Sequence, residues 1–210
     1  MEKELILTPE ELYYLGSFLQ AKYIDYAYVA AMGDIKRNYP LFEQETKASL
    51  VTSGILTEDF GGSLEIDKSI LEILRPIFFG EIETSIDVCY LGETNYVSVN
   101  KFHFYDGIAT MVAGDNGKLV IKSIDQIAIK DFVTALLPET YDCETKIVQD
   151  IDKTKITRFI ATKNIVVGKN ATVKTYIEAD GIIYQETENG IESITRNDFI
   201  SSVYDIVKGV

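Results

Sequence analysis

His103 is the single histidine of this chain, and Cys89 and Cys143 are its two cysteines. A zinc site that needs two or more histidines is therefore excluded, and the cysteines lack the short spacing of a metal-binding pair. A thiol nucleophile needs a base and a cationic or helix N-terminal setting, whereas Cys89 lies in the apolar stretch DVCYL. We expect His103 to be a surface or partly buried strand residue. We expect no catalytic residue, no metal and no cofactor, although a hydrolase that uses Cys89 and His103 stays an alternative if the two groups lie within hydrogen-bond reach.

Other motifs of catalytic or ligand-binding proteins are incomplete. Gly168-Lys169 lacks both the upstream glycine and the following Ser or Thr of a phosphate-binding loop. No Asp-x-Asp-x-Asp-Gly calcium loop occurs. The acidic pair Glu81 and Glu83 is expected on the solvated surface. The chain is accordingly expected to bind a partner rather than to catalyse a reaction.

The composition is acidic and moderately apolar. The 210 residues include 33 acidic and 20 basic side chains, a net charge of -13, and 46% are hydrophobic. Nucleic-acid binding is not expected, because it needs a basic face that displaces counterions from phosphates. The sequence has neither a basic region followed by an apolar run at its start nor an apolar run as long as a membrane span. We expect a cytoplasmic protein that does not insert into a membrane.

Helices are expected in residues 1–82. Thr8-Pro9-Glu10-Glu11 marks a helix start, in which Thr8 caps, Pro9 takes the first position and Glu11 completes a capping box. This helix is predicted to continue to Gly33, and a second one to cover residues 43–53.

The stretch TEDFGGSLEID predicts a short strand with a glycine turn. Asp67 caps a following helix, which Pro76 is expected to end or kink because proline lacks the amide hydrogen. Helix, turn, helix and hairpin resemble a winged helix, but no basic recognition helix is present.

From Glu83 onward the pattern changes to strands rich in β-branched and aromatic residues, joined by Asp-Gly and Asn-Gly turns. Four strands are predicted, then a helix from about Asp125 that Pro138 ends. The second half repeats this plan and finishes in a helix over 194–207. The order Asp-Gly, strand, Asn-Gly, Ile-x-x-x-Asp-Phe occurs twice, from Asp106 and from Asp180, with spacing that agrees across the hairpin and then drifts.

The predicted fold class is α+β, with an N-terminal helical, winged-helix-like segment followed by two quasi-repeated antiparallel β-meander plus helix units. The expected boundaries are 1–82, 83–140 and 141–210, within one globular body. Chance similarity of two such units is an alternative to duplication, because Asp-Gly and Asn-Gly are common turns.

The order of these segments resembles the EspG family and its relatives in Gram-positive bacteria. The resemblance is carried by TPEELYYLGSFL, by KASLVTSGILTEDFGGSLEIDKSILEILRP and by DGIATMVAGDNGKLVIKSIDQIAIKDFVTALLP. It implies a cytosolic chaperone of type VII secretion, which binds a folded helical substrate, covers its apolar tip, and uses neither ATP nor a cofactor. In that family a hairpin loop of the sheet and the C-terminal helical region hold the substrate.

The longest connection between strands of the second half is KNIVVGKNA. Within it Ile165, Val166 and Val167 are apolar and are flanked by Lys163 and Lys169. One interpretation is a short extra strand packed into the core, and the other is an apolar finger that contacts a protein partner. A non-enzymatic regulatory, scaffold or toxin-immunity protein is the alternative to the chaperone, since an acidic chain suits a basic partner.

Overall fold

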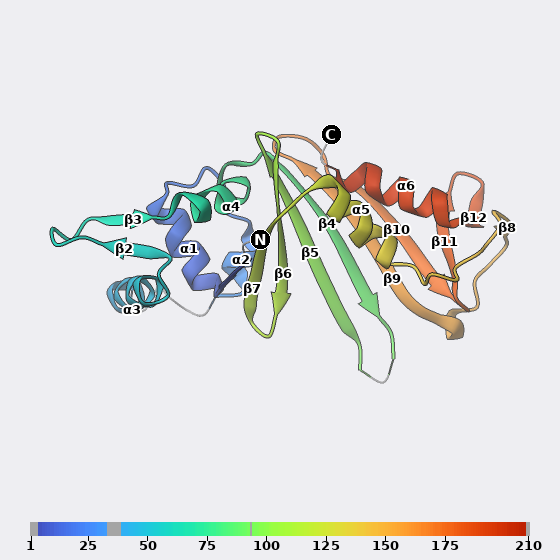
Figure 1. Cartoon of the computed structure of the whole chain (residues 1–210). Coiled ribbons are helices and arrows are strands. Elements are labelled where there is room, and N and C mark those ends of the chain that lie inside the picture. The colour runs from blue at the N-terminus through green and yellow to red at the C-terminus, as the bar shows by residue number, and fades with distance from the viewer. Residues whose placement is uncertain (1–3, 33–38, 93, 209–210) are drawn as a thin grey trace. The chain divides into compact units, whose positions relative to one another are not determined.

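The structure is a computed structural model that describes residues 4–32, 39–92 and 94–208. The chain forms two compact units. Unit 1 comprises Met1–Glu81 and His103–Ser123, and unit 2 comprises Ile82–Phe102 and Ile124–Val210. Figure 1 shows the elements that belong to each unit. Strand β5 (Tyr96–Tyr105) contributes residues to both units.

Unit 1 begins with a strand that was not expected from the sequence, in addition to the predicted strand and glycine turn at TEDFGGSLEID. Its first element is a strand, which pairs antiparallel with a strand more than a hundred residues later: Leu5 opposes Ile121, and Leu7 opposes Leu119. The elements are β1 (Glu4–Leu7), α1 (Pro9–Phe18), α2 (Tyr26–Ala30), α3 (Tyr39–Thr52), β2 (Leu56–Glu58), β3 (Leu64–Ile66), α4 (Lys68–Phe79), β6 (Ile108–Asp115) and β7 (Lys118–Ile124).

The start of α1 is as predicted. The Glu11 amide donates to Thr8 Oγ1 at 3.1 Å, and the Glu11 carboxylate accepts from the Thr8 amide at 2.8 Å. The predicted length was wrong, because α1 ends at Phe18. The predicted stop at Gly33 lies outside the described residues.

The chain leaves the helix after Phe18 because other groups bind its backbone. The amides of Lys22 and Tyr23 donate to the Phe78 carbonyl oxygen at 2.9 and 3.1 Å. Asp25 then caps α2 by accepting from the Ala27 amide at 2.9 Å. The helix therefore ends at Phe18 because of contacts with α4. The spacing of apolar residues along this part of the sequence gives no sign of those contacts.

Helix α4 begins after Asp67, as predicted, and the Asp67 side chain accepts from the Ser69 amide. It does not end at Pro76 but runs to Phe79. Proline removes one helical hydrogen bond, but the turns around it bury Leu74, Ile77 and Phe78. Burial of each such side chain contributes about 1.5–3 kcal/mol, enough to offset one missing bond.

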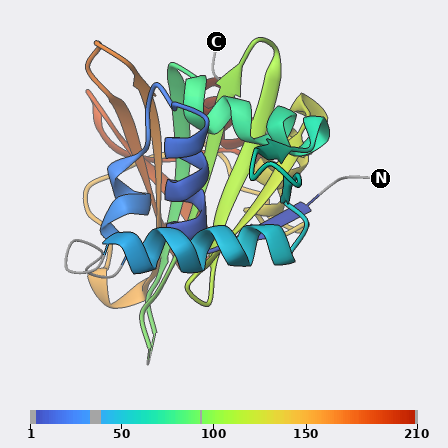
Figure 2. The same cartoon turned by 90° about the vertical axis from the view of Figure 1, so that its left-hand side faces the viewer.

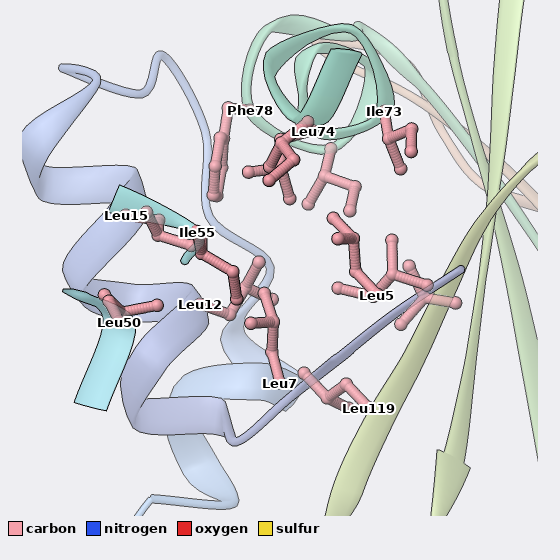
Figure 3. Packing of buried hydrophobic residues seen from close by; sticks show 14 of the residues in the cluster. Leu5, Leu7, Leu12, Leu15, Leu50, Ile55, Ile73, Leu74, Phe78 and Leu119 are labelled. Carbon is pink, nitrogen blue, oxygen red and sulfur yellow. The ribbon is translucent and has the colours of Figure 1, made fainter. Parts of the chain in front are cut away.

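These side chains belong to the core of unit 1. Figure 3 shows Leu12 and Leu15 of α1 close to Leu50 of α3 and Ile55, with Leu74 and Phe78 of α4 above them. Ile55 and Leu56 return to the core after the predicted stop at Gly54, whose φ is 73°.

Unit 2 is a large antiparallel sheet with two helices. Besides β5, its elements are β4 (Ile82–Tyr90), α5 (Gln126–Ala135), β8 (Ile147–Val148), η2 (Lys153–Lys155), β9 (Ile156–Val166), β10 (Thr172–Ala179), β11 (Ile182–Thr187), β12 (Gly190–Ser193) and α6 (Arg196–Val207). The strand order is β5-β4-β9-β10-β11-β12-β8. The central pair, β4 and β9, is antiparallel over nine residue pairs from Ile82↔Val166 to Tyr90↔Arg158.

Both helices of unit 2 pack on the same face of this sheet (Figure 1). The rings of Phe199 in α6 and Tyr176 in β10 meet edge to face at 5.0 Å, and those of Phe132 in α5 and Phe102 in β5 at 5.7 Å. Thr84 of β4 donates to the Val207 carbonyl oxygen at 3.1 Å. Side chains that alternate with these point to the opposite face.

Four strands followed by a helix occur twice along the chain, as β4 to α5 and as β9 to α6. The tight turns Asp106-Gly107 and Asp180-Gly181 have positive φ at both residues, which a type I′ turn requires. Common origin of the two halves and the winged-helix interpretation remain predictions.

Candidate partner-binding site

The segment KNIVVGKNA belongs mostly to strand β9. Ile165 and Val166 were expected in a connection, but β9 continues to Val166. It does so because it is paired on both sides: Val166 opposes Ile82 of β4, and Asn164 opposes Thr172 of β10. The segment is thus the end of a central strand, and the connecting turn is only residues 167–171.

The turn itself has a defined backbone. The Lys169 amide donates to the Val166 carbonyl oxygen at 2.9 Å. Gly168 between them has a φ of 78°, a conformation that glycine adopts without steric cost. Val167 and Lys169 are therefore presented at the tip of an ordered hairpin.

Strand alternation separates the candidate residues between two faces. Asn164 points to the helical face, where its amide donates to the Ile206 carbonyl oxygen of α6 at 3.3 Å. Lys163 and Ile165 consequently point to the other face. Val173 of β10 opposes Lys163 and joins them there. Val166 is half-buried and alternates with Ile165.

Apolar side chains at this end of the hairpin are open to solvent. Ile165 is 39% exposed, Val167 49% and Val173 51%. We call Ile165, Val167 and Val173, with the flanking Lys163 and Lys169, the hairpin patch. The first of the two interpretations of this segment is thus right that it contains a strand, but Ile165 is not packed into the core.

The charges beside the hairpin patch lie on β4 and β5. Lys163 Nζ is 4.0 Å from Asp87 Oδ2, and Glu83 is directly opposite Ile165. Glu83 was expected on the solvated surface, but its side chain is largely buried and lies 2.9 Å from Lys101 Nζ. Burial raises the pKa of Glu83 to about 7 and lowers the pKa of Lys101 to about 8. Desolvation penalises the charged form of each group.

Four residues of the hairpin patch, Lys163, Ile165, Val167 and Lys169, were candidates from the sequence, but Val173 and the acidic neighbours were not. Val173 joins the patch only through the β9–β10 register, and Asp87 and Glu83 only through β4. The two-residue period of TVKTYIE places Val173 opposite in face to Tyr176, which is the one sequence signal for its exposure.

Cys89, Cys143 and His103 lie in ordinary structural surroundings. Cys89 is half-buried on β4 opposite Phe159, and the Cys143 thiol donates to the Glu144 carbonyl oxygen at 3.2 Å. His103 is only 4% exposed, so it is buried rather than at the surface. Its Nε2 lies 2.9 Å from the Tyr28 hydroxyl.

The described part of the chain includes no helix long and apolar enough to cross a membrane. Among the same described residues, no three His, Cys, Asp or Glu side chains are grouped so that they would hold a metal ion.

Comparison with known proteins gives a match in structure but not in sequence. No protein-family model matches the chain. No curated protein matches it either. A chain from the structure of the Mycobacterium tuberculosis type VII secretion system chaperone EspG5 in complex with the PE25–PPE41 dimer is similar, with a TM-score of 0.63. The match is 7% identical and covers 98% of this chain and 96% of that chain. The likeness establishes a shared fold.

Proposed function

We propose that this protein is a cytoplasmic chaperone that holds a helical substrate of type VII secretion soluble before export. The observation that carries the proposal is the likeness to the EspG5 structure, which extends over nearly the full length of both chains. That chaperone was solved with a bound PE25–PPE41 dimer. A protein of the same fold and length is suited to the same class of task.

We further propose that the hairpin patch contacts the substrate. Its exposed Ile165, Val167 and Val173 provide apolar area that a partner can bury, at about 25 cal/mol per Å². The turn is held by the hydrogen bond from Lys169 to Val166 and by the conformation of Gly168, so binding costs little ordering entropy. Lys163 and Lys169 supply positive charge at the rim of this apolar area.

The first test is affinity purification of the tagged full-length protein from its native cytosol, followed by mass spectrometry. Recovery of a helical secreted protein in fixed stoichiometry is the expected result. Recovery of a basic toxin would replace the proposal with an immunity function, for which the net charge of -13 is suited. A toxin complex would also weaken steeply with salt, because long-range charge attraction is screened.

The hairpin patch has its own test once the partner is identified. The double variant Ile165→Ser/Val167→Ser is compared with Ile127→Ser/Ile147→Ser, which removes two exposed apolar residues elsewhere in unit 2. Calorimetric titration should show at least about a tenfold weaker complex for the first variant, as for loss of a central contact. The control should bind like the unaltered protein. Equal affinity of both folded variants would remove the hairpin patch from the interface while leaving the chaperone proposal intact.

A further inference from the structure

Helices α1 and α3 of unit 1 line a small, partly open pocket whose walls are mostly aromatic. Figure 2 shows α3, in light blue, lying crosswise to α1, in dark blue. The pocket has a volume of about 190 Å³. Its lining residues come from one face of α1 and from the first turns of α3: Tyr13, Tyr14, Ser17, Phe18, Tyr39, Phe42 and Glu43.

Three of these rings form a connected group. The ring centroids of Tyr13 and Phe42 are 6.3 Å apart with the planes tilted by 58°, and those of Tyr39 and Phe42 are 5.7 Å apart at 41°. Tilted rings present both faces and edges to the space between them. The face of an aromatic ring carries negative electrostatic potential, which attracts a cation within about 6 Å of the centroid.

One carboxylate lines the same pocket. Glu43 is exposed, and within the described residues it makes neither a hydrogen bond nor an ion pair. Its negative charge acts on a residue of the pocket wall. Burial and, after it, the charge of Glu43 raise the pKa of Tyr14. Glu43 therefore adds negative charge to the lining of the aromatic pocket.

The lysine whose charge acts on Tyr14 is itself paired with a carboxylate. Lys47 lies one turn after Glu43 on α3, but its Nζ donates to the Glu58 carboxylate at 2.7 Å. The charges of Lys47 and Glu58 offset each other, whereas the Glu43 carboxylate has no ion-pair partner among the described residues. Among the described residues, the pocket thus combines aromatic walls with the negative charge of Glu43.

We propose that this pocket is a binding site for an organic cation, namely an ammonium group with alkyl carbons attached. Aromatic walls with a carboxylate at the rim suit such a group, because the rings contact its alkyl surface and attract its charge together with Glu43. An anion would be repelled by Glu43, and a purely apolar ligand would gain nothing from it. The site lies on unit 1 and is separate from the hairpin patch, so it does not rest on the proposed function.

The same chemistry occurs in a free choline-like molecule and in a lysine side chain of a partner protein. The experiment therefore uses three probes: choline, its neutral isostere 3,3-dimethylbutan-1-ol, and Nα-acetyl-lysine N-methylamide, which keeps the side-chain ammonium group. Each is titrated into the full-length protein while the aromatic ring signals are followed by carbon–proton NMR. Choline should shift signals of Tyr13, Tyr39 and Phe42 in a saturable manner, and the neutral isostere should bind at least about twofold more weakly.

The lysine derivative identifies the source of the cation. If it binds as tightly as choline, the natural ligand is a lysine side chain of a protein. If choline alone binds, the ligand is a small quaternary ammonium compound. If neither cation binds, or if choline and its neutral isostere bind equally, the proposal is overturned.

Variants on α3 give a second, independent readout. Glu43→Gln keeps the shape of the side chain and should raise the dissociation constant of choline about two- to fivefold, as expected for loss of one exposed charge. Glu45→Gln removes the same charge from the same helix, is exposed, and does not line the pocket, so it should leave choline binding unchanged. Equal effects of the two variants would mean that only overall charge matters and that the pocket is not the site.

Discussion

The Tyr141 hydroxyl donates a 2.7 Å hydrogen bond to the Ile194 carbonyl oxygen, and it accepts one of 3.2 Å from the Ile183 amide. A single phenol therefore joins the segment after α5 to strand β11 and to the residue that precedes the cap of α6. Burial raises the pKa of Tyr141 to about 12, so the hydroxyl remains a donor throughout the neutral range. All three residues are buried.

Tyr141→Phe should lower the free energy of unfolding by about 1–3 kcal/mol, because it leaves a buried carbonyl and a buried amide without this partner. Urea unfolding followed by circular dichroism measures the loss. Tyr184→Phe is the matched control, since the Tyr184 side chain is half-buried and its hydroxyl has no hydrogen bond among the described residues. A loss of the same size in both variants would contradict the bridging role.

Gly80 joins α4 to β4 where two backbone segments approach closely. A Cβ atom at this position would lie 2.6 Å from the Phe104 carbonyl oxygen and would also meet the Pro76 carbonyl oxygen. Backbone atoms cannot move away as a side chain does, so Gly80→Ala should destabilise the protein by about 1–3 kcal/mol.

The control for this change is Gly114→Ala in β6. No heavy atom lies within 4 Å of the Cβ that this change adds. Alanine costs less backbone entropy than glycine in a strand, so Gly114→Ala should be neutral or stabilising by up to about 1 kcal/mol. Thermal unfolding of the two variants measures the contrast, and similar melting temperatures would contradict the close approach at Gly80.

Glu83 should make stability depend on pH between about 4.5 and 7. Its pKa in the folded protein, about 7, is higher than the ordinary value of 4.5. The folded state therefore holds the proton more tightly, and the stability that this provides is complete below pH 4.5 and lost as the pH rises through 7. Glu83→Gln does not titrate, so its stability relative to the unaltered protein should increase from pH 5 to pH 7.5, by on the order of 2 kcal/mol.

Glu81→Gln provides a control of opposite sign. A hydrogen bond from Lys22 lowers the pKa of Glu81 in the folded protein. That carboxylate contributes stability above its ordinary pKa, so the relative stability of Glu81→Gln should not increase over the same pH range. Urea unfolding at several pH values measures both variants. A pH-independent difference for Glu83→Gln would show that Glu83 titrates normally.

Asp125, the N-cap of α5, should contribute about 1 kcal/mol to the free energy of unfolding. Its carboxylate accepts from the Ala128 amide at 2.7 Å, which satisfies a helical donor that has no partner within the helix. Asp125→Ala should therefore reduce the free energy of unfolding by about 1 kcal/mol. Asp131→Ala removes an exposed carboxylate from the middle of the same helix and should change stability by less than about 0.5 kcal/mol. Chemical unfolding of both variants tests the difference.

The candidate sites depended on tertiary structure to different degrees. Candidate partner-binding residues could be chosen from the sequence because they lie within one short segment: Lys163, Ile165, Val166, Val167 and Lys169. Which of them share a face, and that Val173 joins them, depends on pairing with β10. The aromatic pocket was not predicted, because α1 and α3 come together only in the folded chain.

The sequence by itself determined the turns and the caps. Thr8, Asp67 and Asp125 bind amides two or three residues away, and the turn at Asp106-Gly107 needs positive φ at adjacent residues. These interactions are complete within one short segment, so local residue types are enough to predict them.

Only the tertiary structure decided where the chain departs from local preference. Helix α4 continues through Pro76 because the flanking turns are buried in the core. The predicted long helix stops at Phe18 because the backbone that follows binds Phe78. Strand β1 forms because β7 offers it an edge. In each case a contact between distant segments contributes more free energy than the local preference costs, and no local pattern records that contact.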